Sequence, residues 1–381
     1  MAIEKKRPRG LKSSAASNKA SSKKAKTEAG DNGSDIPENA QTVVIDKVVE
    51  EGDDVGEAAA LFEDAVGKLE KNPTEALTLL RGTIHESDRI LRNWESEQPL
   101  PPIFYYTYGS ALYELGRLTE DEEFSPFLEA AEERLQDGFD HLKAGGDPTA
   151  DQEVVNKMNI SLGKIWLAKA AMSVDADSKD IPELALKALD TLDKTFTDSK
   201  VEPTLLLDVA SIVQNHGDLY LILESRSKFT QWAEEIFKRV LQDDASNARA
   251  LSEIGLHKLS LANYWLERMD EVENKGQVDQ TKRTLEEENA YLAILEAKKY
   301  FINARDVLEK SGSLSPQTYT DLAETYLNEA NLTMCTEEQR ALYEKVVECI
   351  DQARTLADGS DYILPEGLEI FLDEWINDDK R

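Results

Sequence analysis

Residues 73–94 read PTEALTLLRGTIHESDRILRNW, and this stretch decides the fold. A stripe recurs along it at steps of three and four residues: Leu77, Leu80, Ile84, Ser87, Leu91 and Trp94. Such spacing lays one face of an α-helix against a neighbouring element. The segment 72–74 marks the start of the helix, with Thr74 as the expected cap, and the proline-rich run 98–102 ends it. The stretch therefore predicts an amphipathic helix within a larger helical assembly.

The same periodicity continues through most of the chain, and the alternating pattern of strands is missing. Turn signals divide it at Gly145-Gly146-Asp147-Pro148, Asp180-Ile181-Pro182, Glu202-Pro203, Gly276, Gly312 to Pro316 and Gly359. Each segment between two turn signals is long enough for one or two helices. That rhythm is typical of helix-pair repeats.

The tetratricopeptide pattern tests this reading, because its small residues let paired helices approach closely. Four segments match the first helix of the pattern: Tyr319, Leu322, Ala323 and Tyr326; Leu162, Gly163 and Trp166; Tyr105, Tyr108, Gly109 and Leu112; and Leu251, Ile254 and Gly255. Three match the second helix: Ala233, Phe237 and Val240; Ala297, Phe301 and Ala304; and Ala58, Phe62 and Ala65. Insertions at 119–125 and 271–283 exceed the roughly 34-residue period. We therefore predict an all-α, irregular tetratricopeptide-like helix-pair solenoid.

Composition suggests three regions. Residues 1–45 form a basic and then acidic arm that we expect to be disordered, because it holds too few large apolar residues to offset the entropy of ordering. Residues 46–200 form an N-terminal helical-repeat region, and 201–381 a C-terminal tetratricopeptide-like region. One continuous stack and two sub-stacks that meet near residue 200 both fit the pattern.

The charge is distributed unevenly. The chain has a net charge of −31, yet residues 1–27 carry nine basic side chains and one acid, which leaves −39 on the remainder. An acidic body repels phosphate backbones, so it is not expected to bind nucleic acid directly. The same field favours partners with basic surfaces.

The arm contains two basic clusters separated by thirteen residues. They comprise Lys5, Lys6, Arg7 and Arg9, and then Lys23, Lys24 and Lys26. The layout resembles a bipartite nuclear localisation sequence that binds a nuclear import receptor. It predicts a nuclear protein with some cytoplasmic presence. A generic basic tail that contacts RNA through its phosphates is the alternative.

Other features of the sequence limit the cellular compartments in which the protein is expected. No run reaches the roughly 18 to 20 apolar residues that a bilayer crossing needs, and the N-terminus opens with charge, so we expect a soluble, non-secreted protein without a membrane partner. The two cysteines, Cys335 and Cys349, cannot build a disulfide framework or a four-ligand zinc site. Cytosol or nucleus fits best.

A search for chemistry predicts no enzyme, no metal and no cofactor. His85-Glu86 begins like the H-E-x-x-H zinc helix, but Arg89 stands where the second histidine is needed. Phosphate loops and a nucleophile elbow are missing from the sequence. Acid pairs such as Glu234-Glu235 are typical of solvated helix faces, and the spacing of Cys349 indicates a buried structural thiol.

One surface stands out by its charge. Arg81, His85, Arg89 and Arg92 recur near helical spacing beside the stripe of residues 77–94. This basic strip could receive an acidic segment of a partner, or it could pair with internal acids such as Asp88.

The segment 73–94, the opening 6–12 (KRPRGLK) and the run 105–116 together resemble the fungal enhancer-of-translation-termination family. Its members are also described as negative regulators of a 2-oxoglutarate and iron dependent prolyl hydroxylase. The resemblance implies a nuclear, all-helical, non-catalytic scaffold that binds this hydroxylase and influences translation termination and hypoxia-linked transcription. The chemistry would belong to the partner.

Two other functions stay open. A chaperone-linked tetratricopeptide module would bind acidic C-terminal tails, but such clamps need basic residues on their first helices, and 105–112 and 321–327 offer none. An undescribed enzyme would require a catalytic constellation that the sequence does not display.

Overall fold

The computed structural model describes residues 49–50, 52–96, 98–119, 124–145, 152–175, 179–198, 201–273, 283–357 and 362–378. Within them every regular element is an α-helix, which confirms the all-α prediction. The helices are α1 (Asp54–Lys68), α2 (Pro73–Asn93), α3 (Pro102–Leu118), α4 (Phe124–Gly145), α5 (Gln152–Ala171), α6 (Glu183–Asp198), α7 (Pro203–Gly217), α8 (Leu223–Asp243), α9 (Ala248–Glu273), α10 (Leu285–Ser311), α11 (Pro316–Leu332), α12 (Thr336–Ala357) and α13 (Glu366–Asp378). The basic clusters of residues 5–26 lie outside the described residues.

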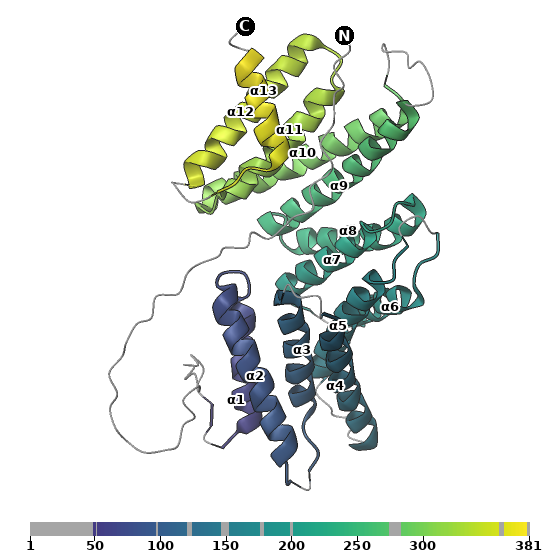
Figure 1. Cartoon of the computed structure of the whole chain (residues 1–381), viewed down its shortest axis with the longest axis vertical. Coiled ribbons are helices and arrows are strands. Elements are labelled where there is room, and N and C mark those ends of the chain that lie inside the picture. The colour runs from purple at the N-terminus through teal and green to yellow at the C-terminus, as the bar shows by residue number, and fades with distance from the viewer. Residues whose placement is uncertain are drawn as a thin grey trace, which may run out of the picture. The chain divides into compact units, whose positions relative to one another are not determined.

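The chain divides into two compact units. Among the described residues, one unit contains α1 to α4, and the other begins near Val155 and contains α5 to α13. Figure 1 shows helices that run antiparallel to their chain neighbours within each unit, such as α1 with α2 and α11 with α12. The predicted boundary near residue 200 falls between α6 and α7. A division into 46–200 and 201–381 stays a prediction.

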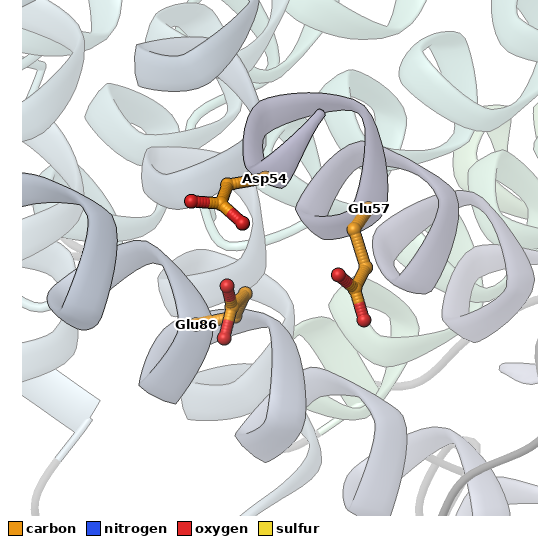
Figure 2. A group of neighbouring side chains, drawn as sticks. All are labelled: Asp54, Glu57 and Glu86. Atoms are coloured by element: carbon orange, nitrogen blue, oxygen red, sulfur yellow. The ribbon is translucent and has the colours of Figure 1, made fainter. Parts of the chain in front are cut away.

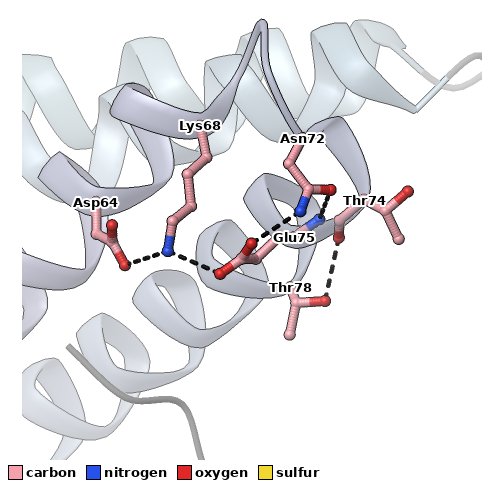
Figure 3. Close-up of polar contacts among 6 residues, drawn as sticks. All are labelled: Asp64, Lys68, Asn72, Thr74, Glu75 and Thr78. Atoms are coloured by element: carbon pink, nitrogen blue, oxygen red, sulfur yellow. Dashed lines mark hydrogen bonds and ion pairs between the residues drawn. The ribbon is translucent and has the colours of Figure 1, made fainter. Parts of the chain in front are cut away.

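The start of α2 differs from the expectation that Thr74 is its cap. Asn72 is the N-cap: its Oδ1 accepts a hydrogen bond from the backbone N–H of Glu75 at 3.3 Å, and its Nδ2 donates to the Glu75 carboxylate at 2.8 Å (Figure 3). Thr74 lies in the first turn, where its carbonyl accepts from the hydroxyl of Thr78. The reason is Pro73, which favours the first helical position and so makes the preceding residue the cap.

The turn between α1 and α2 is held by one lysine. The Nζ of Lys68, in the last turn of α1, lies 2.9 Å from Asp64 and 2.7 Å from Glu75, in the first turn of α2 (Figure 3). These ion pairs are partly exposed and contribute little stability each, but they join the end of one helix to the start of the next.

The buried face of α2 is rotated from the predicted stripe, and the two share only Leu80 and Ser87. It comprises Ala76, Leu79, Leu80, Thr83, Ser87 and Ile90. Trp94, the last residue of the predicted stripe, follows the end of the helix and is 38% exposed. Its Nε1 donates to the carbonyl of Gln98 at 2.8 Å, which links the end of α2 to the segment before α3.

Small residues let the two helices of a pair approach closely. A Cβ atom on Gly255 of α9 would lie 2.6 Å from the ring of Phe301 in α10, and one on Gly163 of α5 would lie 2.7 Å from Leu192 in α6. Both glycines and Phe301 belong to the tetratricopeptide matches. One match is placed differently, because the second-helix pattern of residues 58–65 falls on α1, the first helix of its pair.

Candidate functional site

The predicted basic strip lies along α2. Arg81, His85 and Arg92 are exposed, and the side chain of Arg89 is 42% exposed. Their helical spacing places all four on one face of α2, away from its buried face. Arg81 and His85 make no hydrogen bond or ion pair with any residue that the structure describes, and Arg92 donates only to the carbonyl of Asp88, at 3.1 Å.

Arg89 differs from the rest of the strip because two acids hold it. Its guanidinium lies 2.8 Å from Asp54 on α1, and its Nε donates to Glu86 at 2.9 Å. Hydrogen bonds to Glu86 and Asp54 raise the pKa of Arg89 above its usual range. The carboxylate of Asp88, the expected internal partner, accepts instead from the hydroxyl of Tyr108. Of the four strip residues, only Arg89 forms ion pairs with acids of the described chain. Its partners are Asp54 and Glu86, and not Asp88.

Three carboxylates gather beside Arg89. Asp54, Glu57 and Glu86 each place an oxygen within 4.8 Å of the others (Figure 2). Carboxylate oxygens are the ligands of hard divalent cations, yet Asp54 and Glu57 are exposed and Arg89 already bonds to Asp54 and Glu86. Arg89 ties α1 to α2 through its ion pairs with Asp54 and Glu86, and Glu57 lies beside these pairs.

Three histidines contact polar side chains, and only the pair His216 and Tyr220, four residues apart, has a spacing that the sequence could indicate. His141 lies 3.0 Å from the hydroxyl of Tyr105, and His216 lies 3.1 Å from the hydroxyl of Tyr220. His257 on α9 places its Nε2 3.1 Å from the carboxylate of Glu234 on α8. These partners stand on other helices or in a turn, and only a model of helix packing could have found the contact between His257 and Glu234.

The thiol of Cys349 is buried in the core of α9 to α13, and burial raises its pKa to about 11. A thiol that keeps its proton at neutral pH is a poor nucleophile, in agreement with the structural role predicted for it.

Four acids on α7, α9 and α11 interact electrostatically, each with the next. Asp208 on α7 pairs with Arg249 at 2.5 Å, and Arg249 lies 3.8 Å from Glu253, its neighbour on α9. Burial and the charge of Glu253 raise the pKa of Asp321 on α11 to about 6. Burial and the charge of Asp321 raise the pKa of Glu324 to about 7. We call Asp208, Glu253, Asp321 and Glu324 the acidic row. Arg249 pairs with the first two, and Gln317 donates a hydrogen bond to Asp321 at 2.7 Å.

No helix among the described residues combines the length and apolar character needed to cross a bilayer.

Comparison with known proteins gives relatives with regulatory names. A negative regulator of ofd1 from Schizosaccharomyces pombe is 39% identical over 102 residues, which is 24% of this chain and 26% of the relative. An enhancer of translation termination 1 from Candida albicans is 29% identical over 157 residues, 40% of this chain and 35% of the relative. The chain thus matches only about a quarter to a third of the length of these relatives.

Two solved structures share the fold. One, described as the S. pombe nuclear import adaptor Nro1, has 19% identity and a TM-score of 0.51, and the match covers 86% of this chain and 100% of that one. The second, described as the hypoxic regulator of sterol synthesis Nro1, a nuclear import adaptor, gives a TM-score of 0.50 over 86% of this chain and 94% of its own. At this identity the likeness shows the helical-repeat fold alone.

A family model described as nuclear pore complex subunit Nro1 matches residues 1–244. Since that match covers more than half of the sequence and the fold agrees with solved members, the chain belongs to the Nro1 family.

Proposed function

We propose that this protein is a non-catalytic nuclear adaptor that binds and regulates a 2-oxoglutarate dependent prolyl hydroxylase, with effects on translation termination and hypoxia-linked transcription. Membership of the Nro1 family carries this proposal. Relatives named as a negative regulator of ofd1, enhancers of translation termination and a nuclear import adaptor support its parts. A stack of helix pairs offers extended surface for such a partner.

The site geometry supports an adaptor through the basic strip. Arg81 and Arg92, with the exposed His85 between them, present positive charge that the described part of the chain does not neutralise, on a protein of net charge −31. An acidic segment of the partner would complement this face of α2, and complementary charge raises association rates and specificity.

Affinity purification of the tagged full-length chain tests the proposal. We expect an iron-dependent oxygenase among the captured proteins, and we expect the double variant Arg81→Glu and Arg92→Glu to lose most of it. Lys143→Glu on α4 is the matched control, because its side chain is 72% exposed in the same unit. Recovery of chaperones alone would overturn the proposal. Equal loss in the control would overturn the role of the strip.

The acidic row weighs against the chaperone-linked alternative. A clamp for acidic tails needs lysines and arginines on its first helices, whereas α7, α9 and α11 carry Asp208, Glu253 and the buried Asp321 there, and Arg249 is already paired with Asp208 and Glu253. Like charges at an interface cost binding energy, so an acidic tail is repelled from this face.

The basic arm is proposed to supply nuclear entry through an import receptor. Deletion of residues 1–27 from a fluorescent fusion should shift the protein toward the cytoplasm. Unchanged nuclear accumulation would refute the targeting role of the arm. It would not affect the hydroxylase proposal, which the affinity purification tests separately.

A further inference from the structure

We propose that the outward face of α13 is a docking surface for residues 3–12, the first part of the basic arm of the same chain. Among the residues that the structure describes, the exposed isoleucines all lie in one short stretch: Ile363 (77%), Ile370 (46%) and Ile376 (43%). This stretch comprises α13 and the segment before it. Single exposed apolar residues are ordinary on a protein surface, whereas apolar residues gathered in one place indicate an interaction site.

The inner side of α13 is firmly packed. Leu368 and Leu372 are buried in the core of α9 to α13. The rings of Phe371 and Trp375 stack with centroids 6.1 Å apart, and both contact Tyr343 of α12, at 5.3 and 5.9 Å between centroids. These contacts determine which side of α13 faces outward.

The opposite side of α13 combines apolar and acidic side chains. Helical spacing places Ile370 and Ile376 there, together with Glu366, Glu369 and Asp373. We call these five residues the isoleucine face. All five are exposed, and the three carboxylates make no hydrogen bond or ion pair with any residue that the structure describes. The helix itself contains no lysine or arginine.

The charge of the isoleucine face decides what can cover it. The backbone of a nucleic acid and a second copy of the same face are both anionic, so both are repelled. A segment with lysines and arginines is attracted, because the alkyl stems of these side chains cover apolar surface while their charged ends reach carboxylates. The occupant is therefore basic and carries apolar residues of its own.

Residues 3–12 of the arm, IEKKRPRGLK, have this composition. The four basic side chains of the first cluster lie between Ile3 and Leu11, so aliphatic residues stand on both sides of the cationic centre. The second cluster, at 23–26, has only small residues around it. Charge alone would allow either cluster to dock, and the apolar residues select the first.

The arm also has the advantage of its attachment to the chain. Residues 13–53 join the segment to α1. A chain of that length spans at most about 140 Å, which keeps the segment close to its own helices. Docking is then an intramolecular event, at an effective concentration that a separate protein seldom reaches.

Docking on α13 has a consequence for nuclear entry. It covers the first basic cluster, which the proposed function assigns to an import receptor. The receptor must displace the segment before it can bind both clusters, so the isoleucine face restrains import. The docking itself does not depend on the proposed function, and only this consequence rests on it.

Zero-length cross-linking of the purified full-length chain tests the docking. A carbodiimide joins a lysine amine to a carboxylate as an amide, with loss of water, only where the two groups touch. Mass spectrometry then identifies the joined residues. We expect the lysines of residues 3–12 to be joined to the carboxylates of the isoleucine face, with a yield that falls several-fold in high salt. A mixture of ¹⁴N and ¹⁵N chains separates links within one chain from links between two.

The double variant Ile370→Ser and Ile376→Ser tests the apolar part of the face, because it keeps every charge and every group that can be cross-linked. Both positions are exposed, so the midpoint of thermal unfolding should be nearly unchanged. The yield of links to α13 should fall several-fold with the lost apolar contact. Leu285→Ser with Leu292→Ser on α10 is the matched control, since these side chains are 72% and 52% exposed in the same unit, and it should leave the yield unchanged.

Three results would overturn the docking. Arm lysines joined equally often to exposed acids of α4, such as Glu129 and Asp140, would show that the arm contacts the acidic surface without a preferred site. Links found only between two chains would identify a second copy as the occupant. An unchanged yield in the isoleucine variant would leave charge as the sole attraction. The purified chain contains no hydroxylase or receptor, so none of these results bears on the capture experiment.

A fluorescent fusion tests the restraint on import. The variant with serines at 370 and 376 should accumulate in the nucleus more strongly than the original chain, because its first basic cluster is free. The control with serines at 285 and 292 should match the original chain. Equal accumulation of the two variants would refute the restraint.

Discussion

Gly109 on α3 shows how a single missing side chain sets the distance between two helices. A Cβ atom there would lie 2.7 Å from Leu135 and 3.0 Å from the backbone carbonyl of Ala131, both on α4. The backbone cannot yield as a flexible side chain can. We therefore expect Gly109→Ala to lower the free energy of unfolding by about 1 to 3 kcal/mol, as overpacked cores do. Urea unfolding followed by circular dichroism measures this.

Gly82 on α2 is the matched control in the same unit. A Cβ atom there would meet nothing within 4 Å. Gly82→Ala should stabilise the unit by about 0.5 to 1 kcal/mol, because alanine is the better helix former. Equal effects of the two substitutions would show that Gly109 is not needed for the close approach of α3 and α4.

Glu324 couples stability to pH. Its pKa of about 7 and that of Asp321, about 6, exceed the values near 4 that these side chains have in an unfolded chain. The folded chain therefore binds more protons between about pH 4 and 7, and its free energy of unfolding falls as pH rises through that window. Glu324→Gln keeps the shape of the protonated side chain, so at pH 8 it should stabilise the protein by about 1 to 3 kcal/mol.

The difference between Glu324→Gln and the original chain should vanish near pH 4, where both side chains are neutral. Glu235→Gln, on an exposed position of α8, serves as the control and should change stability little at either pH. A gain that is equally large at pH 4 would point to packing, and would refute the explanation by ionisation.

At the level of the element, two polar residues at the start of α2, Asn72 and Thr74, differ in their side-chain hydrogen bonds. Asn72 accepts from the backbone of Glu75, whereas the Thr74 side chain has no hydrogen bond within the described residues. Asn72→Ala should therefore cost about 1 kcal/mol, the usual value of an N-cap. Thr74→Ala should cost nothing or stabilise by a few tenths, since alanine is the better helix former. The midpoints of thermal unfolding compare the two, and the reverse order would restore Thr74 as the cap.

The elements themselves could be predicted because helical periodicity is local. The stripe of residues 77–91 lies on a helix, and three matched glycines, Gly109, Gly163 and Gly255, lie where paired helices touch. The prediction was wrong at the ends of α2. Pro73 makes Asn72 the N-cap instead of Thr74, and Trp94 lies beyond the last helical residue, where it bonds Gln98.

Contacts between distant helices were beyond the sequence. Arg89 bonds Asp54 across α1 and α2, and His257 bonds Glu234 across α9 and α8. Neither pair is spaced to share a face of one helix, so helical spacing alone could not reveal it.

At the scale of the whole molecule, the separation of charge matters most. Nine basic side chains in residues 1–27 precede a remainder of net charge −39. A basic tail that contacts RNA needs only its charge, since phosphate contacts carry little sequence information. An import receptor instead reads two clusters at a set spacing. The two interpretations of the arm therefore respond differently to a change that keeps its composition.

We expect a scrambled arm to lose nuclear import. In this variant residues 1–27 keep their composition and their local charge, but Lys5, Lys6, Arg7, Lys23 and Lys24 are dispersed among the serines and alanines. The fluorescent fusion should move toward the cytoplasm, while weak RNA binding that depends steeply on salt should persist. A second scramble that preserves both clusters and rearranges only the residues between them is the control, and should stay nuclear. Nuclear accumulation of the variant with the dispersed arm would favour phosphate contacts, because the charge of the arm would then be sufficient for its role without the spacing of the clusters.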